Sequence, residues 1–431
     1  MARYLLFFSR TCVLAFVATI VPLSAFAQSV ESDVPPAPAG AEAPRSDFAM
    51  PEPVGDATLS RMNVVDEHDR FSVKFGLVVM PADYTWFSQD DASVQQVGEQ
   101  DDEWEARSLR LMARGHFEFL RRWNYMLSYE YNGFDQDSDD ADWSTTDVSL
   151  STDFEGVGTL TIGKIKEPFV YEMVGDAANL PHHERLLSPF FVSRNNGLKL
   201  SNTMLDQRGT WSIGWYNDWY VGGDSFGDSG NDVAARVTVL PLLSADGSQY
   251  LHVGAGIRYY AGDNDTLRFK GKPASNVADN YVDTGTFAGD HAWNGSLEVL
   301  WANRGYSLLG EYVRSEVRAS SVGNPTLEGW YLTGSWILSG EHRPYDRKAG
   351  FARRVMPQGH WGAFELVGRV GRVDLDDAGL DGGTMTGWWG AVNWWASRRW
   401  KASIGYGDIE LERSGLTGDT KTVLARIQWI Y

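Results

Sequence analysis

Residues 422–431, TVLARIQWIY, alternate between two faces in a way that decides the fold. One face is apolar throughout and ends on an aromatic ring; it carries Val423, Ala425, Ile427, Trp429 and Tyr431. The other face includes the polar residues Thr422, Arg426 and Gln428. Successive side chains of a β-strand point to opposite sides, so this period of two predicts a strand with one apolar face.

The same period of two recurs from residue 70 to the C-terminus. In one such segment Trp293, Leu297 and Trp301 alternate with Asn294 and Glu298. The repeated pattern predicts sixteen strands, which begin near residues 70, 105, 125, 143, 159, 197, 210, 233, 250, 293, 306, 329, 361, 387, 401 and 421. The segments between them alternate in length. Short connections cover 121–124, 205–209, 302–305 and 396–399, and long ones cover 81–102, 167–196, 261–292 and 372–386, while 340–358 is long where a short one is expected.

The apolar faces indicate a lipid environment. In a membrane every backbone N–H and C=O needs a protein partner, and a closed barrel provides one. A Lys or Arg that faces lipid at mid-depth costs about 2–4 kcal/mol, and these faces are nearly free of charge. The chain also has 18 Trp, 18 Tyr and 20 Phe, enough for two aromatic girdles. Residues 70–431 are therefore predicted to form an all-β fold, a 16-stranded antiparallel transmembrane β-barrel.

The N-terminal part is predicted to be an export signal and a spacer. Residues 1–27 have Arg3 and Arg10, a short apolar stretch and the small-x-small sequence Ala25-Phe26-Ala27, so we expect cleavage before Gln28. Residues 28–69 are rich in Pro, Ala and acidic groups and are predicted to be a disordered periplasmic segment. The only cysteine lies in the signal, which excludes disulfides and thiolate chemistry from the exported chain. Export to a Gram-negative outer membrane follows.

Three segments resemble the phosphate-selective porin O/P family. They are GKIKEPF (163–169), SGEHRPYDR (339–347) followed by GAFELVGRVGRVDL (362–375), and the final pair GAVNWW (390–395) and ARIQWIY (425–431). The resemblance covers roughly residues 70–431. It implies a 16-stranded, usually trimeric porin whose third external loop folds into an anion-selective pore lined by basic side chains.

Basic residues on the polar parity are the candidate pore-lining and anion-binding groups, because basic rings favour anions. They are Lys74, Arg110, Arg114, Arg236, Arg258, Arg369, Lys401 and Arg426. The alternative, given equal weight, is that they pair with lumen acids such as Glu118, Glu130, Asp147, Glu298, Glu311 and Glu365.

The third external loop, from Glu167 to about Asn196, supplies candidate constriction residues. These are Arg185 and Arg194, with Lys164, Lys166 and Lys199 near its ends. Lys164 and Lys166 share parity with Ile162, which leaves their face open. His182, His183 and Glu184 could suggest a metal site, but a solvated loop corner is the favoured interpretation because no second ligand cluster accompanies them.

Other charged segments give different indications of function. The external loops are acidic, which favours a weaker anion preference. Residues 135–143, DQDSDDADW, do not complete a calcium-loop pattern and are predicted to be a solvated loop. The 340–358 connection is hypothesised to be a basic periplasmic vestibule, with Arg343, Arg347, Lys348, Arg353 and Arg354.

These features predict a passive diffusion channel, without a cofactor or enzymatic chemistry, for phosphate or related small anions. The expected partners are those anions, outer-membrane lipid and lipopolysaccharide, the barrel-insertion machinery and two further copies in a homotrimer. The formal charge of −19 argues against nucleic acid. Alternatives are a general or weakly cation-preferring porin, an outer-membrane barrel enzyme with a Ser–His–Asx arrangement, and a secreted sugar-binding β-protein.

Overall fold

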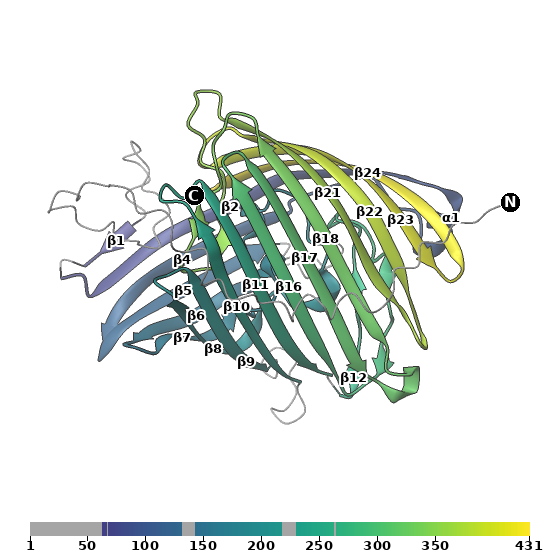
Figure 1. Cartoon of the computed structure of the whole chain (residues 1–431), viewed down its shortest axis with the longest axis horizontal. Helices are drawn as coiled ribbons and strands as arrows, with labels where there is room; N and C mark the ends of the chain where they lie inside the picture. Colours follow the sequence, from purple (N-terminus) through teal and green to yellow (C-terminus); the bar gives the residue numbers. More distant parts are fainter. Residues whose placement is uncertain (1–62, 67, 132–142, 218–229, 263) are drawn as a thin grey trace, which may run out of the picture. The chain divides into compact units, whose positions relative to one another are not determined.

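The sequence folds into the predicted barrel. The computed structural model describes residues 63–66, 68–131, 143–217, 230–262 and 264–431. Within these ranges sixteen long antiparallel strands form one closed sheet (Figure 1). They are β2 (Phe71–Gln89), β4 (Ser108–Phe119), β5 (Arg121–Tyr131), β6 (Trp143–Phe154), β7 (Gly158–Ile165), β8 (Asn195–Met204), β9 (Gly209–Asn217), β10 (Asn231–Leu243), β11 (Gln249–Ala261), β16 (His291–Asn303), β17 (Tyr306–Arg318), β18 (Thr326–Ile337), β21 (Ala363–Asp377), β22 (Leu380–Trp395), β23 (Trp400–Arg413) and β24 (Leu416–Ile430).

The barrel closes because its first long strand, β2, pairs with both the next long strand, β4, and the last one, β24. Its first half, Phe71–Met80, pairs with β4, and its second half pairs with β24 and with the short strand β3 (Glu103–Glu105). The register against β24 shifts between Val79 and Ala82, where Pro81 lacks an N–H to donate. Every long strand therefore has a neighbour on both sides, as a lipid-embedded sheet requires.

The direction of the apolar face is as predicted. On β16, Trp293, Leu297 and Trp301 are 46%, 58% and 41% exposed, whereas Asn294 and Glu298 are each 1% exposed. The apolar parity thus points away from the barrel interior, and the polar parity points into it. A water-soluble barrel would show the opposite arrangement.

Two of the predicted long connections are wrong. The strand β2 continues to Gln89 and is followed by the helix α1 (Asp91–Val97), so the first connection does not begin at residue 81. The strands β21 and β22 extend to Asp377 and Leu380 and join directly at Ala378 and Gly379, so 372–386 is a hairpin. Above the lipid a strand no longer needs an apolar outer face, and its polar sequence then resembles a loop.

Several predictions concern residues outside the described ranges. These residues are the signal, most of the spacer and residues 135–142. The spacer's last residues do contain order, since β1 (Asn63–Val65) pairs with the first residues of β2. The ordered chain therefore begins before residue 70, because the β-branched pair Val64 and Val65 extends the sheet.

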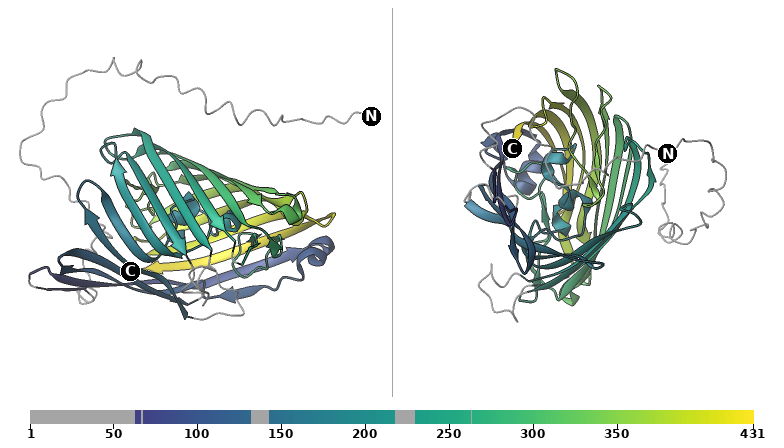
Figure 2. Two further views of the ribbon diagram at one scale, coloured as in Figure 1. Left: turned by 90° about the horizontal axis from the view of Figure 1, so that it is seen from below. Right: turned by 90° about the vertical axis from the view of Figure 1, so that its left-hand side faces the viewer.

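Three connections fold into the barrel. From the external side come the third external loop, residues 166–194, with α2 (Tyr171–Val174), η4 (Ala177–Asn179) and η5 (Ser188–Phe190), and the 262–290 loop, with β12 (Thr266–Leu267), β13 (Lys270–Gly271), β14 (Val282–Asp283) and β15 (Phe287–Ala288). From the other end comes the 338–362 connection, with β19 (Tyr345–Asp346) and β20 (Phe351–Ala352). Seen end on, short helices lie inside the ring of strands (Figure 2).

The inserted segments share an apolar core with the barrel wall. Leu187 and Phe190 of the third external loop pack in one buried cluster with wall residues such as Val313 and Met385. At the external ends of the strands the inward parity is therefore apolar, which the predicted polar interior did not include. No helix in the described part of the chain is long and apolar enough to cross a membrane.

Candidate functional site

Buried ion pairs hold the third external loop against one side of the barrel. Glu167 accepts from Arg258 of β11 at 2.6 Å. Glu172 accepts from Arg369 of β21 at 2.6 Å, and Glu184 accepts from Arg426 of β24 at 2.5 Å. Each loop carboxylate thus neutralises a wall arginine. We call this side the packed wall. It comprises the inner faces of the strands from β10 to β24 and of the second half of β2.

Glu172 is the centre of this attachment. Its carboxylate also accepts the backbone N–H groups of Leu186 and Leu187, at 3.0 and 2.9 Å. The wall residue Glu311 in turn accepts the N–H groups of Tyr171 and Glu172, at 2.7 and 2.9 Å, at the start of α2. Side-chain carboxylates therefore satisfy backbone donors at both turns of the loop, which lets a polar backbone lie inside the barrel.

Five of the candidate pore-lining arginines form ion pairs, as the alternative interpretation holds; one of them, Arg110, pairs with Glu130 and is described below. Arg258, Arg369 and Arg426 bind the loop as described. Arg236 of β10 pairs with Glu298 of β16 at 2.5 Å, and Glu298 also binds His252 at 2.8 Å. Both members of the Arg236–Glu298 pair are at most 3% exposed, so their charges are balanced and shielded from water.

The opposite side of the barrel carries a second group of basic residues, which we call the basic wall. Arg110 and Arg114 lie on β4 and Lys199 on β8, all on the inward parity. Lys166 and Arg194 of the third external loop complete the group, whereas Arg185 is 7% exposed and donates to the carbonyl of Glu172 at 2.7 Å. Three carboxylates accompany the five basic residues of this wall: Glu130 pairs with Arg110 at 2.6 Å, Asp147 with Arg194 at 3.1 Å and Asp176 with Lys166 at 3.2 Å.

The basic wall is wetter than the packed wall. Arg110, Asp147 and Asp176 are 22%, 21% and 50% exposed at the side chain, while their partners Glu130, Arg194 and Lys166 are 2%, 7% and 17% exposed. On the packed wall, Glu172 and Glu298 are both 0% exposed. Water therefore reaches part of this side of the interior, on which five basic groups accompany three carboxylates.

Two candidate residues lie away from this group. Lys164 of β7 stands opposite Val148, which is 38% exposed on the outer face, and its Nζ donates to the carbonyl of Thr145 at 2.8 Å. Lys164 therefore has the outward parity. Lys74 of β2 is exposed and lies in register with Arg114, towards the end of the barrel that has short turns.

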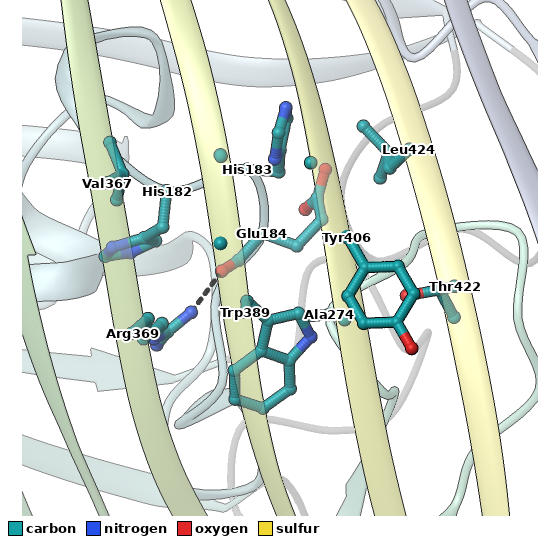
Figure 3. Close-up of a pocket in the computed structure, with 14 residues that line it drawn as sticks. His182, His183, Glu184, Ala274, Val367, Arg369, Trp389, Tyr406, Thr422 and Leu424 are labelled. Atoms are coloured by element: carbon teal, nitrogen blue, oxygen red, sulfur yellow. Dashed lines mark hydrogen bonds between the residues drawn. The ribbon is translucent and has the colours of Figure 1, made fainter.

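The His182–Glu184 segment is buried, so its interpretation as a solvated loop corner is wrong. Figure 3 shows these residues over the inner wall, around a cavity of about 30 Å³. Burial and the nearby Arg369 lower the pKa of His182 to about 4, and burial also lowers the pKa of His183, so both rings are neutral at pH 7. Within the described ranges, no group of three or more His, Cys, Asp or Glu side chains could hold a metal ion.

The 338–362 connection is bound to the barrel rather than open to the periplasm as the vestibule hypothesis requires. Arg343 pairs with Glu365 of β21 at 2.6 Å, and Arg353 pairs with Asp346 at 2.5 Å. Arg347 donates to the carbonyl of Gln207 in the β8–β9 turn at 3.0 Å. Because the connection folds back on the barrel, these three arginines find acceptors within the protein.

One Ser–His–Asp contact occurs that the sequence did not reveal. Ser72 Oγ lies 2.8 Å from His116 Nδ1, and His116 Nε2 lies 3.3 Å from Asp69 Oδ1. Asp69 and Ser72 are only three positions apart, but His116 is distant in sequence, and the β2–β4 register brings it to them. Ser72 is 5% exposed and has the inward parity, so it does not face the membrane lipid that a barrel lipase attacks.

Comparisons with known proteins agree with this architecture. A family model described as phosphate-selective porin O and P matches residues 76–431. The fold resembles the outer membrane channel DcaP of Acinetobacter baumannii at 10% identity, with a TM-score of 0.55 over 85% of this chain and 99% of that one.

Two further solved structures share the fold. An anion-selective porin from Comamonas acidovorans is 12% identical, with a TM-score of 0.52 over 84% and 100% of the chains. The trimer form of OmpT of Vibrio cholerae is 11% identical, with a TM-score of 0.51 over the same shares. Comparison with curated protein sequences found no match.

Proposed function

The chain belongs to the phosphate-selective porin O and P family and is an outer-membrane channel protein, and on that premise we propose that the basic wall makes its pore prefer small anions such as phosphate. Passage is passive, and the barrel needs no cofactor. The wall residues would act as a basic lining that stabilises an anion more than a cation of the same size.

The observation that supports this proposal is the unequal charge balance of the two walls. On the packed wall each named arginine has a carboxylate within 2.7 Å, whereas Arg114 and Lys199 of the basic wall have no ion pair at that range among the residues described. Since the basic wall is also the wetter side, a permeating ion meets its charge.

The acidic external loops favour the alternative of a weak cation preference. Asp376 and Asp377, for example, lie at the outer end of the β21–β22 hairpin. Charges more than about 8 Å from the ion path are largely screened at physiological ionic strength. We therefore expect the loops to influence ion entry and the basic wall to decide selectivity.

The reversal potential of the purified protein in a planar bilayer, across a KCl gradient, tests the proposal. We expect the sign that indicates chloride preference, and we expect the double variant Arg114→Glu and Lys199→Glu to shift the potential towards potassium. Arg318→Glu, on the outer face of β17, is the matched control and should leave the potential unchanged. A cation-directed potential in the unmodified protein would overturn the proposal.

The remaining expectations extend the same proposal. We infer a homotrimer, because the family resemblance implies one. Contacts with lipid, lipopolysaccharide and the insertion machinery follow from the membrane location. Signal cleavage before Gln28 and the absence of enzymatic activity also belong to this proposal. Native mass spectrometry of the detergent-solubilised protein would measure both the number of subunits and the mass of the mature chain, and an uncleaved Met1 or a monomer would contradict it.

A further inference from the structure

A groove of about 560 Å³ lies on the outer face of the barrel, where β2 meets β24. Alanines on three adjacent strands line it: Ala82 of β2, Ala425 of β24 and Ala402 of β23. Ile427 also lines the groove and stands opposite both Ala82 and Ala402 in the sheet. The small side chains leave a hollow in an otherwise bulky apolar surface. Its volume is in the range of about 300–1,000 Å³ that is typical of ligand pockets.

Aromatic side chains border the groove at its two ends. Trp86 and Trp104 lie towards the external ends of β2 and β3, and Trp394 lies near the periplasmic end of β22, next to β23 and β24 (Figure 1). These three rings are 43%, 60% and 40% exposed, so they project from the barrel surface. Tyr84 packs against both external rings, with centroid distances of 4.3 and 6.0 Å. Because aromatic girdles mark the two lipid–water boundaries, the groove between them lies in the hydrocarbon layer.

Two arginines lie just beyond the periplasmic end of the groove. The turn 396–399 follows β22 directly; its sequence, Ala-Ser-Arg-Arg, has two basic residues and no acidic one. Arg398 is exposed, and the guanidinium carbon of Arg399 lies 5.0 Å from the ring centroid of Tyr431. Trp and Tyr rings at a membrane boundary lie at the level of the lipid headgroups. Arg398 and Arg399 are therefore placed where lipid phosphate occurs.

A phospholipid fits these charges better than a second copy of the chain does. Copies in one membrane have the same orientation, so their periplasmic ends lie at one level. Three other short turns of this chain also carry arginine: Arg121 with Arg122, Arg208 and Arg304. A neighbouring barrel would thus bring like charges towards Arg398 and Arg399, whereas a lipid phosphate has the opposite charge.

We propose that the groove binds one phospholipid of the periplasmic leaflet. One acyl chain lies over Ala82, Ala402 and Ala425, and the phosphate accepts charge-assisted hydrogen bonds from Arg398 and Arg399. The lipid thereby covers the line along which the first and last long strands pair. The inference depends on the outer-membrane location of the barrel and not on the ion preference of its pore.

Native mass spectrometry of the purified protein, released from detergent micelles that contain dioleoyl-phosphatidylglycerol, tests the groove. We expect one lipid per subunit to stay bound after other lipid and detergent dissociate. Ala402→Phe fills the hollow and should weaken lipid binding by about tenfold or more, the factor that two buried methylene groups contribute. Ala255→Phe is the matched control, because Ala255 of β11 stands opposite Leu297 on the outer face, away from the groove. It should bind lipid like the unmodified protein.

A second pair of variants tests the position of the phosphate. The double variant Arg398→Gln and Arg399→Gln should also bind the phospholipid about tenfold or more weakly, since a hydrogen bond to a charged group contributes at least that factor. Arg208→Gln with Arg304→Gln removes the same charge from two other short turns and is the control. Dioleoylglycerol, which has the same chains without phosphate, should bind equally to the unmodified protein and to the double variant of 398 and 399.

The outcomes separate this inference from its alternatives. Absence of a retained lipid, or binding by folded Ala402→Phe within about twofold of the unmodified protein, would overturn the site; heat-modifiable mobility on gels verifies folding. Unchanged phospholipid binding by the double variant of 398 and 399 would overturn the placement of the phosphate. Dissociation of an oligomer into monomers by Ala402→Phe but not by Ala255→Phe would assign the groove to a second copy and overturn the lipid. A retained lipid on a pore with a cation-directed reversal potential would instead refute the proposed function alone.

Discussion

Both walls of the barrel interior carry basic residues, but these residues have different roles on the two walls. On the packed wall, arginines such as Arg258 and Arg369 meet loop carboxylates in dry, balanced pairs. On the basic wall, Arg114 and Lys199 lie in a wetter region where basic groups outnumber acids. Burial rather than residue identity therefore separates a structural arginine from one that a solute can meet, because an unpaired charge is tolerated only where water remains.

The largest effect is expected from Glu172→Ala, on the packed wall. The change leaves Arg369 buried without its carboxylate and removes the acceptor of two backbone N–H groups. Breaking one side of a buried pair costs about 3–5 kcal/mol. We expect the third external loop to leave the wall, with a lower thermal midpoint and a higher single-channel conductance.

The control for this variant is Glu118→Ala. Glu118 pairs with Arg122 near the β4–β5 turn, and both side chains are well exposed. Such a pair contributes about 0–1 kcal/mol, so midpoint and conductance should be nearly unchanged. If Glu172→Ala behaved like Glu118→Ala, the loop would not depend on the packed wall, and the distinction between the two walls would fail.

A smaller effect is expected from Asp147→Asn, on the basic wall. The substitution removes the carboxylate that faces Arg194 while keeping its shape. One charge near the ion path changes the energy of a permeating ion by about 1 kcal/mol in a watery setting, or about fivefold in permeability ratio. The chloride-to-potassium ratio from reversal potentials should rise, and a fall would contradict a basic wall that selects anions.

The paired replacement Arg236→Met with Glu298→Leu sharpens the comparison from the other side. It removes a balanced, dry pair together with the Glu298 acceptor of His252, and because no net charge is lost we expect the reversal potential to stay the same. Substituting apolar residues for a buried pair is often neutral for folding. A clear change in ion selectivity would show that solutes also meet the packed wall.

The smallest effect is expected from Ser72→Ala, which tests the barrel-enzyme alternative. The change removes two hydrogen bonds to His116, one with the ring Nδ1 and a longer one from the backbone N–H, each with a net contribution of about 0.5–1.5 kcal/mol. Conductance and selectivity should be unaffected. Ester hydrolysis by the purified protein that this variant abolishes would establish a catalytic role for the Ser–His–Asp contact and contradict the proposed absence of enzymatic activity.

Much of the barrel could be predicted because each strand carries its own period of two. The pattern of β16 alone gives the direction of its faces. The apolar core of the interior was missed, although a signal existed: on β17 the charged Arg314, Glu316 and Arg318 share the outward parity, which leaves Val313 and Val317 to face inward. Where a strand leaves the lipid, its outer face becomes polar and its inner face becomes apolar. The prediction assumed instead that each face keeps one polarity along the whole strand.

The ion pairs between wall arginines and loop carboxylates could not be predicted from the sequence. Arg369 and Glu172 are 197 positions apart, and Arg426 and Glu184 are 242 apart. Nothing local in the chain says which lumen arginine meets the loop and which remains wet. That depends on where the third external loop lies, and the family resemblance supplied only the expectation that it folds inward.

The attachment of one loop to β11, β21 and β24 has a mechanical consequence. A thin cylindrical sheet without internal support flattens easily into an ellipse. The contacts of Glu167, Glu172 and Glu184 brace the cylinder from within and connect strands that share no backbone hydrogen bonds. We therefore expect the cross-section to fluctuate little, and the open-channel current to show little low-frequency noise.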